Sequence, residues 1–193
     1  MEKLKLGISS CLLGHKVRYD GGHKYDAWLV ETLGQYVDYV PVCPEAGCGM
    51  SIPREALRLV GTKDDYRLIT VKTGIDYTDQ MLEFSYETLK RLESEQLCGY
   101  VFKSKSPSSG MERVKVYPPH GGAAGKTGVG IWAREFMRAY PLLPVEEEGR
   151  LHDPVLRENF IERIFIMQRW WDMVNSKPRA GDLVKFHTIH KYL

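Results

Sequence analysis

Three loop segments, far apart in the chain, each follow a short apolar run and each carry cysteine or serine, its oxygen analogue. The apolar runs are residues 4–8, 39–42 and 99–102, and each predicts a β-strand. If these strands are parallel neighbours, the three loops meet at one edge of the sheet, where open α/β folds bind their ligands. We therefore expect the cysteines and serines of the three loops to share one site.

The remainder of the chain alternates short apolar runs with amphipathic stretches, which is typical of βαβ folds. Helical spacing of apolar residues predicts helices at residues 26–36, 78–96, 131–140 and 154–175. Further short strands are expected at residues 67–73, 111–117 and 142–145. We predict an α/β fold, a Rossmann-like three-layer sandwich with a mostly parallel sheet.

Charge and composition exclude several classes of protein. Lys and Arg total 27 and Asp and Glu total 25, so a formal net charge of +2 offers no global field for nucleic acid, although a local basic patch is compatible with it. No apolar run approaches the roughly 18 residues that a membrane span needs, and lysines interrupt the apolar N-terminus where a secretory signal would lie. We expect a cytosolic protein with no membrane partner, whose cysteines are thiols or metal ligands.

The four cysteines differ in their surroundings. Cys11 and Cys43 lie among Pro, Gly and Ser in loops, and thiolates suit zinc or iron–sulfur clusters. Cys48 follows five residues after Cys43 in a Gly-rich turn, within reach of the same site. Cys98 begins a strand and is expected to be a buried core residue. Because no Cys-x-x-Cys pair is present, spacing alone leaves metal binding and a structural role both open.

Polar residues in the same loops are candidates for chemistry. Glu45, two residues after Cys43, would lie beside a bound metal as a general acid or base, or else be a solvated loop carboxylate. Ser106 and Ser108 flank a proline, where serines usually bond their own backbone. A functional serine needs a base or a metal beside it, and the sequence alone identifies neither.

Basic and aromatic residues near the loops suggest ligand contacts. Arg18 suits a phosphate or carbonyl oxygen, and Tyr19 suits stacking on a base. Lys103 adds positive charge beside the serines, although surface lysines are normally only solvated. The glycine-rich residues 125–130 match neither phosphate-binding glycine motif, so we expect these glycines to permit close packing at a helix entrance rather than to bind a nucleotide.

Five motifs occurring together resemble one protein family. They are SCLLG at residues 10–14, VRYDGG at 17–22, CPE at 43–45, PRE at 53–55 and KSKSPS at 103–108. In combination they resemble the thiouracil desulfidase family, over about residues 4–170. The resemblance implies removal of sulfur from thiolated uracil, either free or as 4-thiouridine in tRNA. Water would attack the thiocarbonyl carbon and sulfide would be released without net redox change.

The resemblance also implies a cofactor and roles for individual residues. The family holds a 4Fe-4S cluster with three cysteines, of which two fall on Cys11 and Cys43 and the third falls on Ser109. By the same matching, Glu45 is the catalytic glutamate and Ser106 the catalytic serine. The candidate substrate-binding residues are Arg18, Tyr19, Lys103 and Ser108.

The serine at position 109 departs from the family pattern. A serine alkoxide is a harder and more basic ligand than a thiolate and should hold iron less well. Three explanations stay open, in this order: an introduced Cys→Ser substitution, a third thiolate supplied by Cys48, or a member that has lost the cluster and the activity.

The resemblance divides the chain into two parts. Residues 1–175 are expected to be the catalytic desulfidase-like domain, and residues 176–193 a linker and the truncated start of a second, helical domain, as in the two-domain tRNA 4-thiouridine desulfidases. That domain, absent from this chain, would supply most RNA contacts. The rival hypothesis is a non-catalytic RNA- or nucleotide-binding module whose cysteines are structural or bind zinc.

Overall fold

Four parallel strands form the central sheet of the computed structural model, which describes residues 3–191. They are β1 (Leu4–Ser9), β2 (Val37–Val42), β5 (Gly99–Phe102) and β8 (Val145–Glu147). Their order across the sheet is β2-β1-β5-β8. Strand β1 therefore pairs with β2 on one side and with β5 on the other, all in parallel. The predicted mostly parallel sheet is confirmed.

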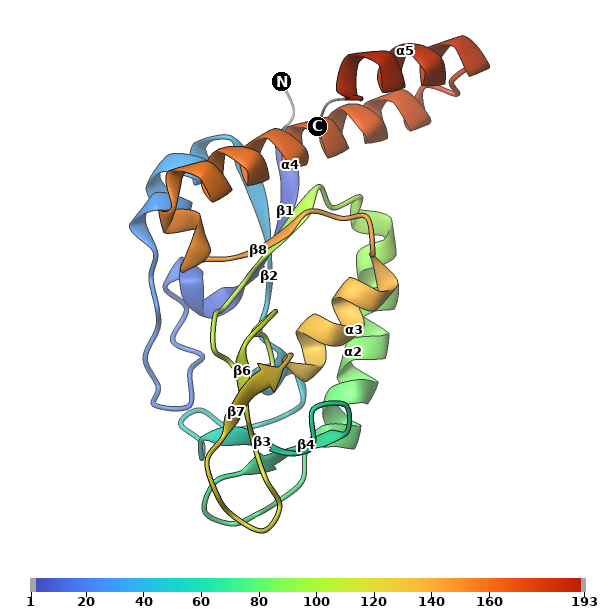
Figure 1. Ribbon diagram of the computed structural model, residues 1–193. Coiled ribbons are helices and arrows are strands. Elements are labelled where there is room, and N and C mark those ends of the chain that lie inside the picture. Colours follow the sequence, from blue (N-terminus) through green and yellow to red (C-terminus); the bar gives the residue numbers. More distant parts are fainter. Residues whose placement is uncertain (1–2, 192–193) are drawn as a thin grey trace.

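Helices cover both faces of this sheet (Figure 1). On one face lie α2 (Thr78–Leu92) and α3 (Ile131–Ala139). On the other lie α4 (Pro154–Asn175) and two irregular helical turns, η2 (Trp28–Thr32) and η3 (Leu33–Gln35). The three-layer α/β sandwich predicted from the sequence is confirmed. The predicted helix at residues 26–36 is a π turn followed by a 3-10 turn.

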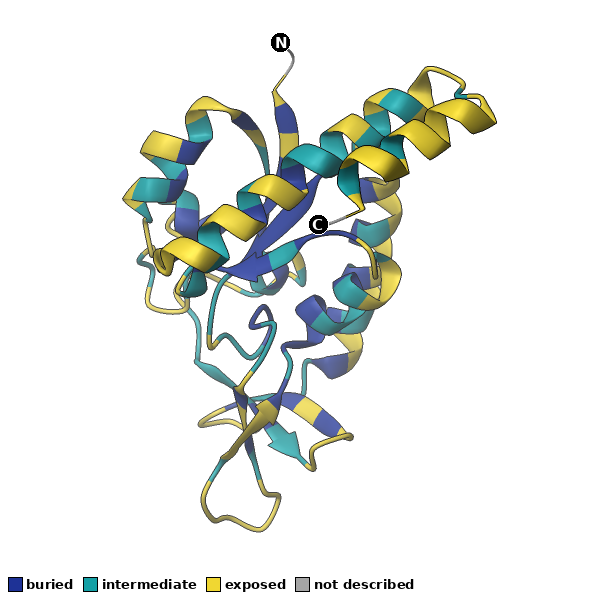
Figure 2. Cartoon of the chain, turned by 45° about the horizontal axis from the view of Figure 1, so that its top comes forward, coloured by how far each residue is buried: buried dark blue, intermediate teal, exposed yellow. Residues whose placement is uncertain are grey.

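Successive side chains along each strand point to opposite faces of the sheet, and a separate hydrophobic core forms on each face. On β5, Tyr100 and Phe102 pack with α3, whereas Val101 packs with α4. On β1, the residue opposite Tyr100 is Gly7, and a Cβ there would lie 2.3 Å from the Tyr100 ring. The absence of a side chain at position 7 is what admits this large aromatic group. Figure 2 shows the buried residues concentrated in the sheet and on the inner helix faces.

A second, mixed sheet extends from the first. Its order is β4-β3-β6-β7, formed by β3 (Leu57–Gly61), β4 (Tyr66–Thr70), β6 (Val114–Tyr117) and β7 (Gly125–Gly128). Strands at 67–73 and 111–117 were expected, whereas β3 and β7 were not. The sequence of β7 is Gly-Lys-Thr-Gly and three of its four residues are exposed, so it lacks the apolar alternation that marks a strand.

The last strand and the C-terminal helices complete the architecture. A strand was predicted at residues 142–145, but β8 begins only at Val145, the residue that pairs with Tyr100 of β5. Helix α4 has the predicted start, with Asp153 accepting hydrogen bonds from the next two non-proline amides. After a short turn, α5 (Ala180–His190) packs on α4 through Trp170 and Phe186. The expectation that residues 176–193 open a second domain stays a prediction, and its last two residues lie outside the described chain.

Short elements connect the larger ones. They are η1 (Ser10–Leu13), α1 (Pro44–Gly47), η4 (Glu93–Glu95) and η5 (Arg150–His152). Within residues 3–191, none of the helices combines the length and the apolar character that crossing a bilayer demands.

The entrance of α3 packs directly on the loop of residues 103–110, which we call the serine loop. Amides of Gly130 and Ala133 donate to the carbonyls of Gly110 and Ser108, at 2.7 and 3.3 Å. A Cβ at Gly130 would lie 2.4 Å from the backbone carbonyl carbon of Ser108 and 2.6 Å from the amide nitrogen of Ser109. Close packing at this glycine, as expected from the sequence, therefore sets the position of the serine loop.

Replacing Gly130 with alanine should destabilise the protein by about 1–3 kcal/mol, because the obstructing atoms are backbone and must shift. Urea unfolding followed by circular dichroism measures this. Gly125→Ala is the control, since its Cβ would make only ordinary contacts with Thr127. Equal stabilities of the two variants would contradict the packing argument.

Candidate active site

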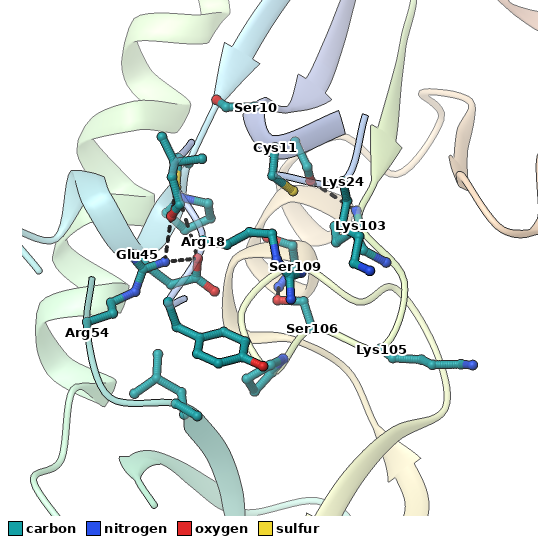
Figure 3. A pocket seen from close by; sticks show the side chains of 18 of the residues that line it. Ser10, Cys11, Arg18, Lys24, Glu45, Arg54, Lys103, Lys105, Ser106 and Ser109 are labelled. Atoms are coloured by element: carbon teal, nitrogen blue, oxygen red, sulfur yellow. Dashed lines mark hydrogen bonds and ion pairs between the residues drawn. The ribbon is translucent and has the colours of Figure 1, made fainter. Parts of the chain in front are cut away.

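A cavity of about 430 Å³ opens at the carboxyl ends of β1, β2 and β5 (Figure 3). The chain passes from β1 to β2 on one side and later returns to β5 on the other side of β1, so the topological switch point of the sheet lies at the ends of β1 and β5. Residues of all three predicted loops line this cavity, including Cys11, Cys43 and Ser109. The structure thus brings together the three positions that the sequence singled out.

Cys11 is held in η1, directly after β1. Its carbonyl accepts hydrogen bonds from the amides of Gly14 and Lys24, at 3.4 and 2.8 Å, which fixes the turn. Gly14 adopts a φ of 89°, in the left-handed region that favours glycine. The side chain of Cys11 is directed toward Ser109 in the close-up view (Figure 3).

Cys43 ends the next strand and precedes the short helix α1. Its Sγ lies 3.9 Å from the Val17 carbonyl oxygen and 4.0 Å from Oε2 of Glu45. Burial, followed by the charge of Glu45, raises the pKa of the Cys11 thiol to about 11 and also raises the pKa of the Cys43 thiol. A metal bound by these thiols would have to displace their protons.

A chain of hydrogen bonds links the serine loop to Glu45. The Ser108 hydroxyl donates to Oε1 of Glu45, and the hydroxyls of Ser106 and Ser108 are 2.9 Å apart. Since a carboxylate only accepts, the single Ser108 proton points to Glu45, and Ser106 donates to Ser108. Ser106 Oγ in turn accepts from the amides of Ser108 and Ser109, at 3.3 and 3.1 Å.

Arg54 holds the other oxygen of Glu45. Its Nη2 lies 2.8 Å from Oε2 of Glu45 and donates to the Val17 carbonyl at 2.9 Å. The Arg54 side chain is only 6% exposed, so this is a largely buried ion pair. Residue-level reasoning assigned Arg54 no role. The available signal was its place in the PRE motif of the family resemblance.

Three of the four predicted substrate-binding residues line the cavity, and the fourth, Ser108, lies behind its lining. Arg18 and Tyr19 line the cavity, with the Arg18 guanidinium 5.3 Å from the centre of the Tyr19 ring. Lys103 also lines it, although its Nζ is bound to Glu148 and to Ser104. Ser108 is fully buried, and its hydroxyl bonds Glu45 and Ser106. The geometry places Ser108 behind Ser106, as a link between that residue and Glu45.

The two remaining cysteines lie apart from the cavity lining. Cys48 packs against α2, where its Sγ lies 3.7 Å from the Gln80 carbonyl oxygen and from the Met81 sulfur. Cys98 is buried at the start of β5, as expected, with its Sγ 3.3 Å from Oε1 of Gln168. Cys48 is the alternative source of a third thiolate, and its side chain faces α2 rather than the cavity.

The three residues that the family resemblance assigns to a 4Fe-4S cluster all line the cavity, and they offer two thiols and one hydroxyl. Cys11 and Cys43 are close enough for the charge of one thiol to affect the pKa of the other. Ser109, the position that the resemblance gives to the third cysteine, is 3% exposed and lines the cavity. Within residues 3–191 no group of three or more His, Cys, Asp or Glu is arranged to bind a metal ion, and this trio supplies only two such side chains. The site therefore offers two soft ligands and one hard one.

Comparisons with known proteins identify the family of this chain. Residues 6–148 match the sequence model of the family described as 2-thiouracil desulfurase. The uncharacterized protein YbbK of Bacillus subtilis (strain 168) is 33% identical over 111 residues, which cover 53% of this chain and 71% of that protein. The solved structure of a 4Fe-4S-dependent thiouracil desulfidase, TudS, has a TM-score of 0.63 and 27% identity, covering 81% of this chain and 99% of that one. This chain belongs to the 2-thiouracil desulfurase family.

Proposed function

We propose that this protein is an iron–sulfur-dependent desulfidase that removes sulfur from thiolated uracil. Water adds at the thiocarbonyl carbon, the carbon–sulfur bond breaks, and uracil and hydrogen sulfide are formed without transfer of electrons. The observation that carries the proposal is the convergence of Cys11, Cys43, Ser109 and Glu45 on one cavity in a chain of this family. The cavity volume of about 430 Å³ falls in the range of small-molecule sites.

Cys11, Cys43 and Ser109 would hold the 4Fe-4S cluster. When bound, the cluster supplies a Lewis-acidic iron for the departing sulfur. Cys48 is disfavoured as the third ligand because its thiol packs against α2. Of the three explanations for Ser109, an introduced Cys→Ser substitution is then the one compatible with the proposed activity.

The chain's own proton path runs from the cavity into the protein. Ser106 lines the cavity and can pass its proton to Ser108, which passes its own to Glu45. The two backbone amides that donate to Ser106 Oγ stabilise negative charge there as that proton leaves. Glu45 is then the general base of the reaction, either through this relay or directly toward water in the cavity.

Arg54 orients this base. Its ion pair fixes Oε2 of Glu45, so Oε1 is left to face Ser108. The same Nη2 donates to the Val17 carbonyl, next to Arg18 and Tyr19 in the chain. Arg54 therefore has a positioning role. The rim residues Arg18 and Tyr19 contact the uracil ring.

We further propose 4-thiouridine, free or in tRNA, as the substrate. The exposed Tyr19 ring at the cavity rim supports recognition of a base by stacking. All four cysteines are unpaired, as thiols are in a reducing compartment, which supports a cytosolic location. The alternative, a nucleotide-binding module with zinc-bound cysteines, would show zinc without iron or sulfide on elemental analysis.

Installing cysteine at position 109 tests the proposed function most directly. Ser109→Cys should raise iron toward about four per chain after anaerobic reconstitution, because a thiolate replaces a hard oxygen ligand. Sulfide release from 4-thiouridine should rise in proportion. The control is Ser85→Cys, which adds a thiol on α2 and should leave both unchanged. A colourless Ser109→Cys protein without sulfide release would refute the proposal.

The buried relay predicts a defect in proton transfer. Ser108→Ala, measured in the reconstituted enzyme, should lower kcat by about 10²–10⁴ while iron content stays the same, because the path from Ser106 to Glu45 is cut. Ser85→Ala is the matched control, since Ser85 is also buried and its hydroxyl donates to the Met81 carbonyl within its own helix. Full activity of Ser108→Ala would exclude the relay.

The Glu45–Arg54 pair should be strongly coupled in stability. A double-mutant cycle with Glu45→Gln and Arg54→Met should give a coupling energy of about 1–3 kcal/mol in urea unfolding, since the pair is largely withdrawn from water. The exposed pair Arg67–Asp76 serves for comparison and should give a much smaller coupling energy. Similar coupling energies in the two cycles would contradict the expectation that burial strengthens the Glu45–Arg54 interaction.

A further inference from the structure

Three consecutive glutamates end the last strand of the parallel sheet, and the proposed mechanism uses none of them. Glu146 and Glu147 are the final residues of β8, and Glu148 follows directly. Glu146 and Glu147 are buried, and the Glu148 side chain is only 13% exposed. Carboxylates are seldom withdrawn from water to this extent unless they are paired or hydrogen-bonded. The partners of these three glutamates therefore show which part of the molecule they hold.

Glu148 binds the start of the serine loop. Its Oε2 accepts a hydrogen bond from the Ser104 amide at 2.7 Å. Its Oε1 accepts from the Ser104 hydroxyl at 2.8 Å and from Nζ of Lys103. The parallel pairing of β8 with β5 brings the residue there, since the Glu148 amide donates to the Phe102 carbonyl at 3.2 Å. Both oxygens of this carboxylate are thus committed to the first two residues of the loop.

The other two glutamates hold the chain just beyond the end of the serine loop. Oε1 of Glu147 accepts from the Met111 amide at 2.9 Å. Glu146 lies 2.7 Å from Nε of Arg150, and Nη1 of Arg150 lies 3.0 Å from the Glu112 carboxylate. The end of β8 is therefore connected to the serine loop at both of its ends.

Between these ends the loop contains a residue in a disfavoured backbone conformation. Lys105 has a φ of 58°, in the left-handed region that side chains of its kind rarely adopt. Its side chain is directed away from Ser106 and Ser109 in the close-up view (Figure 3). Such a conformation persists only where the surrounding structure fixes the residues around it. Here Glu148 fixes Ser104 on one side, and two loop amides fix Ser106 on the other.

Lys103 connects Glu148 to the cavity wall. Lys103 lines the cavity, and its amide donates to Oγ of Ser9, the last residue of β1, at 3.0 Å. Its Nζ is bound to Glu148 and also donates to the carbonyl and the hydroxyl of Ser104, each at 3.0 Å. The backbone of Lys103 is thus held by β1 and its ammonium by Glu148, which defines where the serine loop leaves the sheet.

We propose that Glu148 is a positioning residue for the reaction. It fixes the first two residues of the serine loop, so that the Ser106 hydroxyl faces the cavity and donates to Ser108. Glu148 acts through this loop rather than on the substrate. Its role in the reaction rests on the proposed function, whereas its hold on the loop does not.

Hydrogen exchange of backbone amides tests the hold on the loop and needs no catalysis. Glu148→Met replaces the carboxylate with an unbranched side chain of similar length, so the amides of residues 103–110 should exchange about tenfold faster. Mass spectrometry of peptides measures the exchange, and urea unfolding gives the global stability. Unchanged exchange in the loop, or an increase shared equally by β1 and α4, would overturn the proposal.

Two further variants separate positioning from a general loss of charge. Glu135→Met, on α3, removes a carboxylate that is 18% exposed and paired with two arginines, and it should leave exchange in the loop unchanged. Glu148→Gln keeps an oxygen for the Ser104 amide and should restore most of the protection, and no recovery would count against the proposal. If Glu148→Met does not fold, Lys103→Met/Glu148→Met also removes the unpaired ammonium and should show the same faster exchange.

Steady-state kinetics test the role in the reaction. In the reconstituted Ser109→Cys enzyme acting on 4-thiouridine, Glu148→Met should lower kcat about 10–10²-fold at equal iron content. KM should stay within about twofold, because Ser106 is displaced while the contacts of the cavity rim are kept. An unchanged kcat, or a change confined to KM, would refute this role. If the Ser109→Cys enzyme itself releases no sulfide, the proposed function fails, and the exchange result still decides whether Glu148 positions the loop.

Discussion

The parallel pairing of β1 with both β2 and β5 is the constraint on which the site depends. Because β1 is the common neighbour, the loops after these three strands leave the sheet at the same edge and surround one cavity. The pairing itself requires Gly7, since any side chain there would meet the Tyr100 ring. A packing requirement in the core thus decides where residues separated by nearly one hundred positions meet.

The serine loop shows how a polar site is supported by backbone contacts. Helix α3 donates its first amides to this loop, and Gly130 permits the approach. Ser106 is then fixed by two amides, Ser108 by Glu45, and Glu45 by Arg54. Each polar atom in this series has its partner in place before any substrate arrives, which limits the reorganisation that proton transfer would need.

The two sheets present chemically different side chains. The parallel sheet has thiols, hydroxyls and a carboxylate at its edge, whereas the mixed sheet has cations on its outer face. A net charge of +2 conceals this distribution because most acidic residues lie elsewhere. Local pairing, rather than total charge, decides what the surface attracts: Arg150 is neutralised by two glutamates, while Arg58 is left with an unsatisfied donor.

The parallel sheet, the major helices and the main residues of the cavity could all be predicted from the amino-acid sequence. Apolar runs and helical spacing are local signals, and the motifs identify the family. Strand β7 was not predicted, because its exposed Gly-Lys-Thr-Gly carries no such signal. The contact between Ser108 and Glu45 was not predicted either. Three features could be seen only in the folded chain: Cys48 packs against α2, Arg54 pairs with Glu45, and basic residues of three strands line one groove. These are contacts between segments distant in the chain, and strand register and helix packing, not local sequence, bring such segments together.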